Sequence, residues 1–112
     1  MPTLFEKLIA GEIPADFVHE DEHCVAFKDV APQAPVHLLV VPREPIESLA
    51  AAEDRHKPLL GHLLRVVDKV ASDAGLTDGY RVAINTGEGG GQTVPHLHLH
   101  VLGGRGMSWP PG

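Results

Sequence analysis

Hydrophobic residues recur every three or four positions between residues 54 and 74, and this spacing predicts one long amphipathic helix. Pro58 suits the first turn of such a helix, and Gly75 is placed to end it. A shorter helix is expected near the N-terminus, because Thr3 and Glu6 have the spacing of a capping box. The stripe of the long helix that should face the core consists of Leu60, Leu63, Leu64, Val67, Val70 and Ala74.

Five further segments have the composition of strands: DFVHED, HCVAFKDV, VHLLVVPR, GYRVAIN and HLHLHVL. The first two are separated by so few residues that they predict a hairpin. The third is continuously apolar, which is typical of a strand buried on both faces. Together the elements predict a single α+β domain over residues 1–112, with a five-stranded antiparallel sheet, one main helix and the short N-terminal helix.

The segment PHLHLHVLGG places a histidine at every second position: His96, His98 and His100. Alternate side chains of a strand point to the same side, so the three imidazoles should share one face of the sheet. Leu97 and Leu99 should share the other face and point toward the core under the main helix. A solvated polar face would be built as well from threonine, lysine and glutamate, so three consecutive histidines indicate chemistry.

A metal site is one explanation of the three histidines, because imidazole is the commonest metal ligand. On a regular strand, however, the first and third histidines start ~13 Å apart at a rise of ~3.3 Å per residue. Ligand nitrogens around one ion are only ~3–4 Å apart, since each metal–nitrogen bond is ~2.0–2.1 Å. All three would converge only on a bent strand. A metal site built from His37 and two of the three histidines is kept as an alternative.

Nucleophilic chemistry at phosphorus is the other explanation. A neutral imidazole attacks through one nitrogen when the other nitrogen donates its proton to a fixed acceptor. His98 has a neighbour on each side and is the natural nucleophile, with His96 and His100 as its support. The preceding segment TGEGGGQTVP fits this hypothesis, because its glycines let the backbone approach a phosphate, while Gln92 and Thr93 add an amide and a hydroxyl.

Composition limits the class of partner. The 112 residues carry a formal net charge of −6 and contain no run of lysine or arginine, which argues against binding to a nucleic-acid polymer. A single nucleotide is compatible with this charge, since backbone amides can hold its phosphate. No apolar run approaches the ~20 residues of a membrane span, and the N-terminal segment does not resemble a secretory signal. A cytoplasmic protein without membrane contact is therefore expected.

The other reactive residue types show no motif of their own. Cys24 is the single cysteine, and within HCVAFKD it is expected to be a small core residue rather than a reactive thiol. His19, His23, His56 and His62 have no partner pattern and are expected at the surface.

The segment HLHLHVL matches the histidine-triad pattern His-φ-His-φ-His-φ-φ, in which φ is apolar, at every position. The agreement extends to DVAPQAPVHLLVVPR, to GYRVAINTGEGGGQTVPHLHLH and to the ending VLGGRGMSWPPG. From Leu4 to Gly112 the chain resembles the histidine triad (HIT) superfamily, and within it the Hint branch of histidine triad nucleotide-binding proteins. The resemblance implies one HIT domain over residues 1–112, two copies of which join their sheets into a ten-stranded sheet in a homodimer.

The resemblance also implies an activity. Members of this branch are purine nucleoside phosphoramidate hydrolases, which split the P–N bond of substrates such as adenosine 5′-phosphoramidates and release AMP and an amine. The ligand would be a purine nucleotide of the AMP or GMP type, and neither a metal nor another cofactor would be needed. By motif position His98 resembles the nucleophile that becomes nucleotidylated. His96 and His100 flank it, and His37 resembles the fourth histidine of the site.

Further positions resemble those that hold the nucleotide. Asn85, Gln92 and Thr93 fall where relatives contact the phosphate and the leaving group. Asp29 falls where a carboxylate accepts the ribose hydroxyls, although on its own it would be taken for a turn residue before APQAP. The base pocket would be formed by Phe5, Leu8, Ile13, Phe27, Lys28 and Val30.

Three positions depart from the usual pattern of the branch. Thr93 stands where serine is common, Lys28 where some members have histidine, and Pro95 restrains the residue before the triad. Two other functions stay open: a nucleotide-binding scaffold or regulatory protein with little turnover, and a dinucleotide polyphosphate hydrolase. The ending SWPPG favours the Hint branch, and Trp109 within it is expected to pack on the partner subunit or near its pocket.

Overall fold

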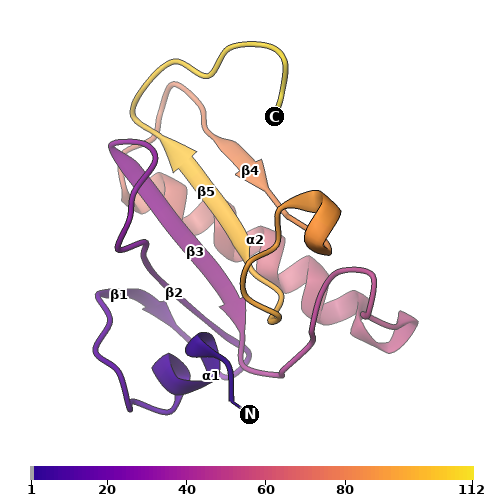
Figure 1. Ribbon diagram of the computed structural model, residues 1–112. Coiled ribbons are helices and arrows are strands. Elements are labelled where there is room, and N and C mark those ends of the chain that lie inside the picture. The colour runs from indigo at the N-terminus through magenta and orange to yellow at the C-terminus, as the bar shows by residue number, and fades with distance from the viewer. Residues whose placement is uncertain (1) are drawn as a thin grey trace.

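The computed structural model describes residues 2–112, which form one five-stranded antiparallel sheet with the strand order β1-β2-β3-β5-β4. The strands are β1 (Phe17–Glu20), β2 (Cys24–Lys28), β3 (Val36–Pro42), β4 (Arg81–Ala83) and β5 (Leu99–Gly103). The α-helices are α1 (Leu4–Ile9) and α2 (Lys57–Asp73), and the 3-10 turns are η1 (Asp54–His56) and η2 (Glu88–Gly90). In Figure 1, α2 runs behind the sheet and α1 lies at its lower end. The predicted α+β fold is confirmed.

The sheet separates two hydrophobic clusters. Between the sheet and α2, Val40 packs with Leu63. On the other face Leu39 and Val41 pack with Phe5 of α1. Successive residues of β3 therefore alternate between the two clusters, and the strand is buried on both faces as its continuous apolar sequence predicts.

Helix α2 has the predicted ends, with Pro58 in its first turn and Gly75, at φ +79°, directly after its C-cap. Its predicted stripe is wrong at two positions: Leu64 is 52% exposed, and Ala74 is the exposed C-cap. Leu64 is turned ~100° around the helix axis from Leu63, because one residue advances the helix by 1/3.6 of a turn. The buried positions of α2 are Leu63, Val66, Val67, Val70 and Ala71.

Within residues 2–112 no helix is long and apolar enough to span a membrane.

Helix α1 begins with the predicted capping box. The Thr3 hydroxyl accepts a bond from the Glu6 amide, and the Glu6 carboxylate accepts one from the Thr3 amide, both at 3.1 Å. These bonds satisfy two amide groups that would otherwise lack partners. Phe5 and Leu8 are buried against the sheet face opposite α2, whereas Leu4 is 49% exposed.

Strand β5 begins at Leu99, three residues later than predicted. Continuing the β3–β5 register would set Leu97 opposite Pro42. Proline has no amide hydrogen to donate to the ladder, and the Leu97 amide donates instead to a loop carbonyl at 2.7 Å. His96 and His98 therefore precede the regular strand. The expectation of an evenly spaced triad on one strand is wrong at this point.

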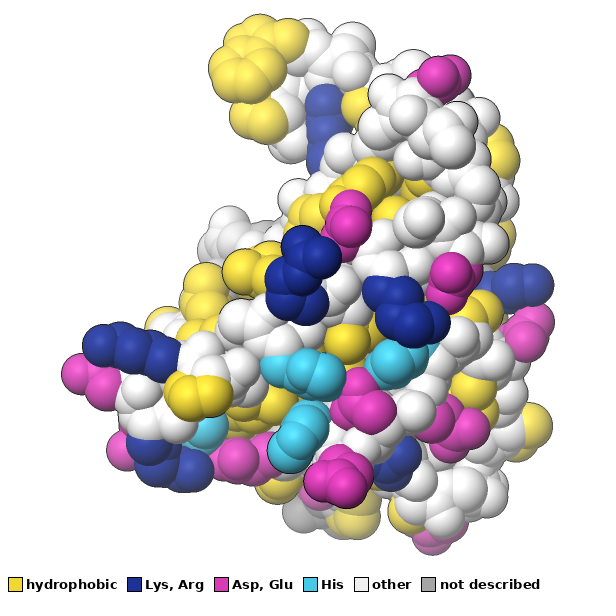
Figure 2. Space-filling model, turned by 180° about the vertical axis from the view of Figure 1, so that it is seen from behind, with side chains coloured by type: hydrophobic (Ala, Val, Ile, Leu, Met, Phe, Trp, Pro, Cys, Tyr) yellow, Lys and Arg dark blue, Asp and Glu magenta, His cyan; other side chains and the backbone are white. Residues whose placement is uncertain are grey.

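The sequence predicts that His19, His23, His56 and His62 lie at the surface without partners. In the structure, three of the four contact carboxylates. His56 is buried, and its Nε2 lies 2.7 Å from Glu44 Oε2. His19 and His62 both contact Asp21. Figure 2 views the molecule from behind the sheet and shows histidine side chains gathered among acidic and basic ones. The single cysteine is fully buried, as predicted.

Candidate active site

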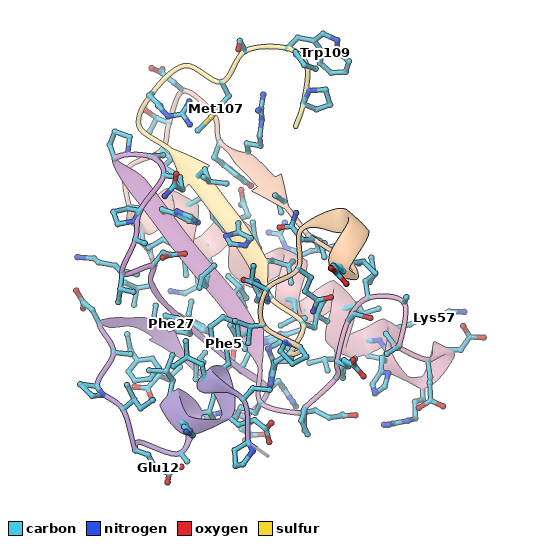
Figure 3. The ribbon with its side chains drawn as sticks, viewed as in Figure 1. Phe5, Glu12, Phe27, Lys57, Met107 and Trp109 are labelled. Carbon is cyan, nitrogen blue, oxygen red and sulfur yellow. The ribbon has the colours of Figure 1, made fainter. Side chains whose placement is uncertain are left out.

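A pocket of about 330 Å³ opens on the sheet face that carries α1. Its walls are mainly apolar, and Phe5 and Phe27 meet there edge to face with ring centroids 5.7 Å apart (Figure 3). An apolar pocket with a few polar groups is typical of a small-molecule site. It brings together ten of the residues singled out from the sequence: Phe5, Leu8, Ile13, Phe27, Lys28, Asp29, Val30, Thr93, His98 and His100.

One ring nitrogen of His98 is bonded to the backbone, and the other has no hydrogen-bond partner among residues 2–112. The side chain is 5% exposed, and its Nδ1 lies 2.7 Å from the carbonyl oxygen of His96. Because a carbonyl only accepts, Nδ1 carries the proton, and Nε2 keeps its lone pair. The ring of Phe5 stands edge on to the His98 ring, with centroids 4.9 Å apart, and makes this environment apolar. His98 therefore has the tautomer of a nucleophile.

His96 is buried more deeply and lies outside the pocket lining. It is 1% exposed, and its Nε2 donates to the carbonyl oxygen of Pro42 at 2.8 Å. Its Nδ1 is the one buried side-chain polar atom without a hydrogen-bond partner in the part of the chain that the structure describes. The side chain of His96 fixes the bend before β5, and its carbonyl orients His98. It is a positioning residue.

A chain of hydrogen bonds sets the tautomer of His100. The backbone amide of Gln33 donates to His37 Nδ1 at 3.0 Å, so His37 carries its proton on Nε2. That Nε2 donates to His100 Nδ1 at 2.8 Å. His100 therefore carries its proton on its own Nε2. Since the rings of His98 and His100 have centroids 5.0 Å apart, a proton donor stands beside His98.

Both pocket histidines are held in the neutral form. Burial lowers the pKa of His98 below its ordinary 6.5, although its bond to the His96 carbonyl acts in the opposite direction. Burial lowers the pKa of His100 to about 4, and charge on His98 and His37 adds to the effect. A neutral ring is the form that attacks phosphorus, so the environment of His98 favours reaction near neutral pH.

Asp29 serves as both a turn residue and a pocket carboxylate. Its Oδ1 accepts the amide of Ala31 at 2.8 Å, which is the turn expected before APQAP. Its Oδ2 lies 3.5 Å from His37 Nε2. Lys28 also lines the pocket, but its ammonium group pairs with Asp16 at 3.3 Å, and both side chains are exposed.

Asn85 and Gln92 lie outside the pocket lining, and their amides shape the glycine-rich loop. Asn85 Nδ2 donates to the carbonyl of Gly90 at 2.8 Å. Gln92 Oε1 accepts the Gly87 amide at 2.9 Å, and its Nε2 donates to two backbone carbonyls at 2.7 and 3.0 Å. Gly87 and Gly91 have φ of +73° and +84°, a region that favours glycine. The contacts of Asn85 and Gln92 with a phosphate stay a prediction.

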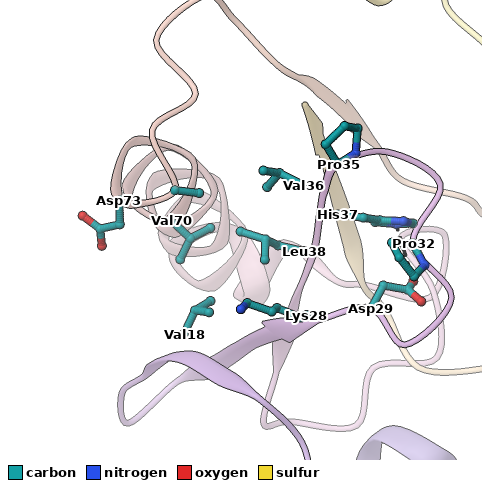
Figure 4. Close-up of a pocket in the computed structure, with 11 residues that line it drawn as sticks. Val18, Lys28, Asp29, Pro32, Pro35, Val36, His37, Leu38, Val70 and Asp73 are labelled. Carbon is teal, nitrogen blue, oxygen red and sulfur yellow. Dashed lines mark ion pairs between the residues drawn. The ribbon is translucent and has the colours of Figure 1, made fainter. Parts of the chain in front are cut away.

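A larger cavity of about 640 Å³ lies on the α2 side and is lined mainly by aliphatic side chains (Figure 4). His37 and Asp29 contribute to its lining but point to the opposite side of β3 from Val70. None of the triad histidines is among the described residues that line it. The candidate active site is therefore the smaller pocket, where the free nitrogen of His98 and the donor of His100 come together.

One set of side chains at this site has the geometry to hold a metal. Ligand atoms of Asp29, His37 and His100 lie within 4.8 Å of one another. The set differs from the alternative considered from the sequence, because it includes one triad histidine instead of two. A cation bound there would have to replace the hydrogen bond between His37 and His100.

Residues 10–107 match the family model of the HIT domain. The chain belongs to the HIT family. Among its HIT relatives, the 14 kDa zinc-binding protein of Zea mays is 53% identical over 113 residues, which cover 99% of this chain and 88% of the maize protein. The solved HIT family hydrolase from Legionella pneumophila is 47% identical with a TM-score of 0.96, and the match covers 99% and 100% of the two chains.

A second solved structure carries the Hint name. The histidine triad nucleotide-binding protein of Candida albicans is 30% identical with a TM-score of 0.82, and the match covers 97% of this HIT chain and 83% of the Candida chain. The resemblance to histidine triad nucleotide-binding proteins is thus confirmed at the level of family and fold.

Two backbone groups of this HIT site are not predicted from the sequence. The Gln33 amide sets the tautomer of His37, and the Pro42 carbonyl holds His96. Backbone contacts do not depend on the identity of the side chain, so no residue type signals them.

Trp109 is 84% exposed and stands at the C-terminal tail, away from the labelled Phe5 and Phe27 (Figure 3).

Proposed function

We propose that this HIT protein is a purine nucleoside phosphoramidate hydrolase, which cleaves the P–N bond of adenosine 5′-phosphoramidates and related nucleotidyl amines. The observation that carries the proposal is the free Nε2 of His98 in an apolar pocket, beside the proton donor of His100. The names of the Legionella and Candida structures, a hydrolase and a nucleotide-binding protein, support the same class of activity.

In the first step, Nε2 of His98 attacks the α-phosphorus. An N–P bond forms as the bond from phosphorus to the amine breaks, and the nucleotidyl group is transferred to His98. Nε2–H of His100 donates to a phosphoryl oxygen as negative charge develops there. The departing amine takes up a proton from the Thr93 hydroxyl or from water; Thr93 carries the single hydroxyl side chain among the described residues that line the pocket.

In the second step, water attacks the phosphorus of the nucleotidyl-histidine. An O–P bond forms, the N–P bond to His98 breaks, and AMP is released, while the proton that the attacking water loses returns to the group that protonated the amine. The His96 carbonyl holds the proton on Nδ1 of His98 in both steps, so the nucleophile returns in the tautomer that it had at the start. No metal takes part in this scheme.

The pocket supports a purine nucleotide in one orientation. The base would lie against Phe5 and Phe27, and the Asp29 carboxylate would accept the two ribose hydroxyls. The side-chain amides of Asn85 and Gln92 already bond to the glycine-rich loop, so they would act on the phosphate mainly through the shape of that loop.

We also propose that two copies form a homodimer with a ten-stranded sheet. Strand β4 is at one edge of the sheet and pairs with β5 alone among the described strands. Val82 on β4 and Leu64 on α2 are exposed apolar residues, at 37% and 52%. Open sheet edges and exposed apolar groups favour pairing with another chain. Trp109 would then pack on the partner subunit or near its pocket.

Substrate comparison tests the proposed activity. The wild-type protein should release AMP from adenosine 5′-phosphoramidate at the same rate with and without EDTA, and more slowly from a diadenosine polyphosphate. Liquid chromatography of the AMP formed measures both rates. Binding of AMP without turnover would instead indicate a scaffold. Loss of activity in EDTA, in protein whose melting transition stays intact and in which His62→Gln behaves as wild type, would indicate metal chemistry at Asp29, His37 and His100. Faster polyphosphate cleavage would indicate a dinucleotide hydrolase.

The pH profile should show that His98 stays neutral in mildly acidic solution. Because burial lowers the pKa of His98, its ring gains a proton only below the ordinary 6.5. The acid limb of kcat/KM, which reports the free enzyme, should therefore have its midpoint below 6.5. Initial rates from pH 4.5 to 8, corrected for hydrolysis without enzyme, measure this midpoint. A midpoint above 6.5 would contradict the assignment of His98 as the nucleophile.

A further inference from the structure

A bulge in β1 turns His19 to the face of the sheet opposite the candidate active site. Between Phe17 and His19 the pairing with β2 shifts register, so that Phe17 pairs with Phe27 and His19 with Ala26. Phe27 belongs to the cluster on the α1 side, and Ala26 to the cluster on the α2 side. In a regular strand residues two apart share a face. The bulge separates them and directs His19 toward His62 of α2.

Four metal-binding groups meet on this face. The Nε2 atoms of His19 and His62 lie 2.6 and 2.7 Å from the same carboxylate oxygen, Oδ2 of Asp21. Cys24 Sγ lies 3.5 Å from that oxygen. The other oxygen, Oδ1, accepts the backbone amides of His23 and Cys24 at 2.7 and 2.8 Å, which hold the carboxylate in place. The hairpin of β1 and β2 and the helix α2 thus contribute side chains around one point.

The Asp21 carboxylate is surrounded by donors, which favours its ionised form. The Nε2 atoms of His19 and His62 meet one oxygen, and two backbone amides donate to the other. The Cys24 thiol beside it is fully buried. A bound cation would displace the thiol proton.

We propose that His19, Asp21, Cys24 and His62 form a site for a divalent metal of the zinc type. Two imidazoles, a carboxylate and a thiolate are a donor set that zinc accepts in tetrahedral coordination. Ligand atoms of the first three residues already lie within 4.8 Å of one another, and His62 contacts the same oxygen. On binding, each imidazole shifts its proton from Nε2 to Nδ1, and Cys24 releases one proton to solvent.

The site is separate from the proposed chemistry. His100 pairs with Leu39, which belongs to the cluster on the α1 side, whereas His19 pairs with Ala26 on the α2 side. A metal at Asp21 would connect the β1–β2 turn to α2 through His62. Its function would be to stabilise the fold, because binding to the native state alone raises the free energy of unfolding.

Cobalt(II) provides the probe, because its absorption spectrum reports the ligands directly. The wild-type protein, freed of metal with EDTA and dialysed, should bind one equivalent of cobalt(II) with tetrahedral visible bands and a thiolate-to-cobalt band in the near ultraviolet. His19→Gln and His62→Gln should each weaken binding by more than about 10-fold, the lower end of the loss seen when even an outer partner of a ligand is removed. Cys24→Ala should lose the near-ultraviolet band.

His23→Gln is the matched control. Its ring packs edge to face on the His62 ring with centroids 5.3 Å apart, and the hydrogen bond that His23 makes to Asp21 comes from its backbone amide. Cobalt(II) affinity in this variant should stay within about 2-fold of wild type, against the loss expected for a removed ligand. His100→Gln removes one residue of the other candidate metal cluster, which consists of Asp29, His37 and His100. The cobalt(II) affinity of the Asp21 site should be unchanged in this variant.

Thermal melting separates loss of binding from loss of folding. Added zinc should raise the Tm of wild type and of His23→Gln, but not of His19→Gln or His62→Gln, whose metal-free melting should stay cooperative. The proposal would be overturned by the absence of cobalt(II) binding in wild type, by unchanged affinity in both ligand variants, by the absence of the thiolate band, or by binding lost only in His100→Gln. Phosphoramidate hydrolysis plays no part in these readouts, so the two proposals succeed or fail independently.

Discussion

His98→Ala should lower the rate of AMP release from adenosine 5′-phosphoramidate by more than about 10⁴-fold, since loss of a covalent nucleophile removes the entire first step. At the pocket, Nε2 of His98 is the one triad nitrogen with a free lone pair. In His100, Nδ1 accepts the bond from His37 and Nε2 carries the proton, while His96 lies outside the pocket lining. Single-turnover kinetics with radiolabelled substrate measure the residual rate.

The covalent intermediate provides a second readout of the same prediction. Wild-type protein quenched in acid-free denaturant during turnover should carry one nucleotidyl group per chain, located on His98 by mass spectrometry of its peptides. His98→Ala should carry none, and His98→Asn, which fills more of the vacated space, should also carry none.

His56→Gln is the matched control, because His56 is 4% exposed and His98 is 5% exposed, yet His56 contacts Glu44 outside the pocket. Its rate should stay within about 3-fold of wild type, a small change on the scale of catalytic losses. A rate in His98→Ala within 10-fold of wild type, with the melting transition intact, would contradict the nucleophile assignment.

The local elements of this fold are accessible from the sequence because short-range physics determines them. The capping box at Thr3 and Glu6 depends on residues three positions apart. The burial of β3 on both faces follows from its unbroken apolar run. The family resemblance then places Phe5, Phe27 and Asp29 in one pocket, although they are distant from His98 in sequence.

Long-range geometry explains what the sequence does not predict. The triad bends before β5 because the register with β3 brings Pro42 opposite Leu97, and that register is a property of two strands. The tautomer of His100 depends on His37, 63 positions away in the sequence. The bulge that separates Phe17 from His19 has no glycine or proline to mark it, so alternation along β1 suggests a shared face that the structure does not have.

The same long-range geometry assigns different functions to chemically equal residues. All three triad histidines look alike in the motif, but in the proposed mechanism His96 positions, His98 attacks and His100 donates, because their ring nitrogens have different hydrogen-bond partners. His19 and His62 are ordinary surface histidines in sequence, and only the contact of β1 with α2 brings them to one carboxylate. A motif therefore indicates the kind of chemistry, and the contacts of each side chain in the folded protein determine its role.

Leu63→Ala should produce the largest loss of stability among single truncations in α2, about 2–5 kcal/mol in the free energy of unfolding. Leu63 is fully buried between α2 and the sheet, where Val40 and Leu99 belong to the same cluster. Strand backbones fixed by hydrogen bonds on both sides cannot collapse into the space that the side chain leaves, so the loss of burial and the cavity both cost free energy. A native domain has only about 5–15 kcal/mol in total, so this loss would be a large fraction of it.

Urea unfolding in EDTA at one fixed protein concentration measures this loss, because subunit association and bound metal would otherwise shift the transition. The midpoint should fall while the m-value, which follows the surface exposed on unfolding, stays the same. Leu4→Ala makes the same truncation at a side chain that is 49% exposed and should cost less than about 1 kcal/mol. Equal losses in the two variants would mean that α2 is not held by the packing of Leu63 against the sheet, and that its attachment depends on its ends, at η1 and at the turn after Ala74.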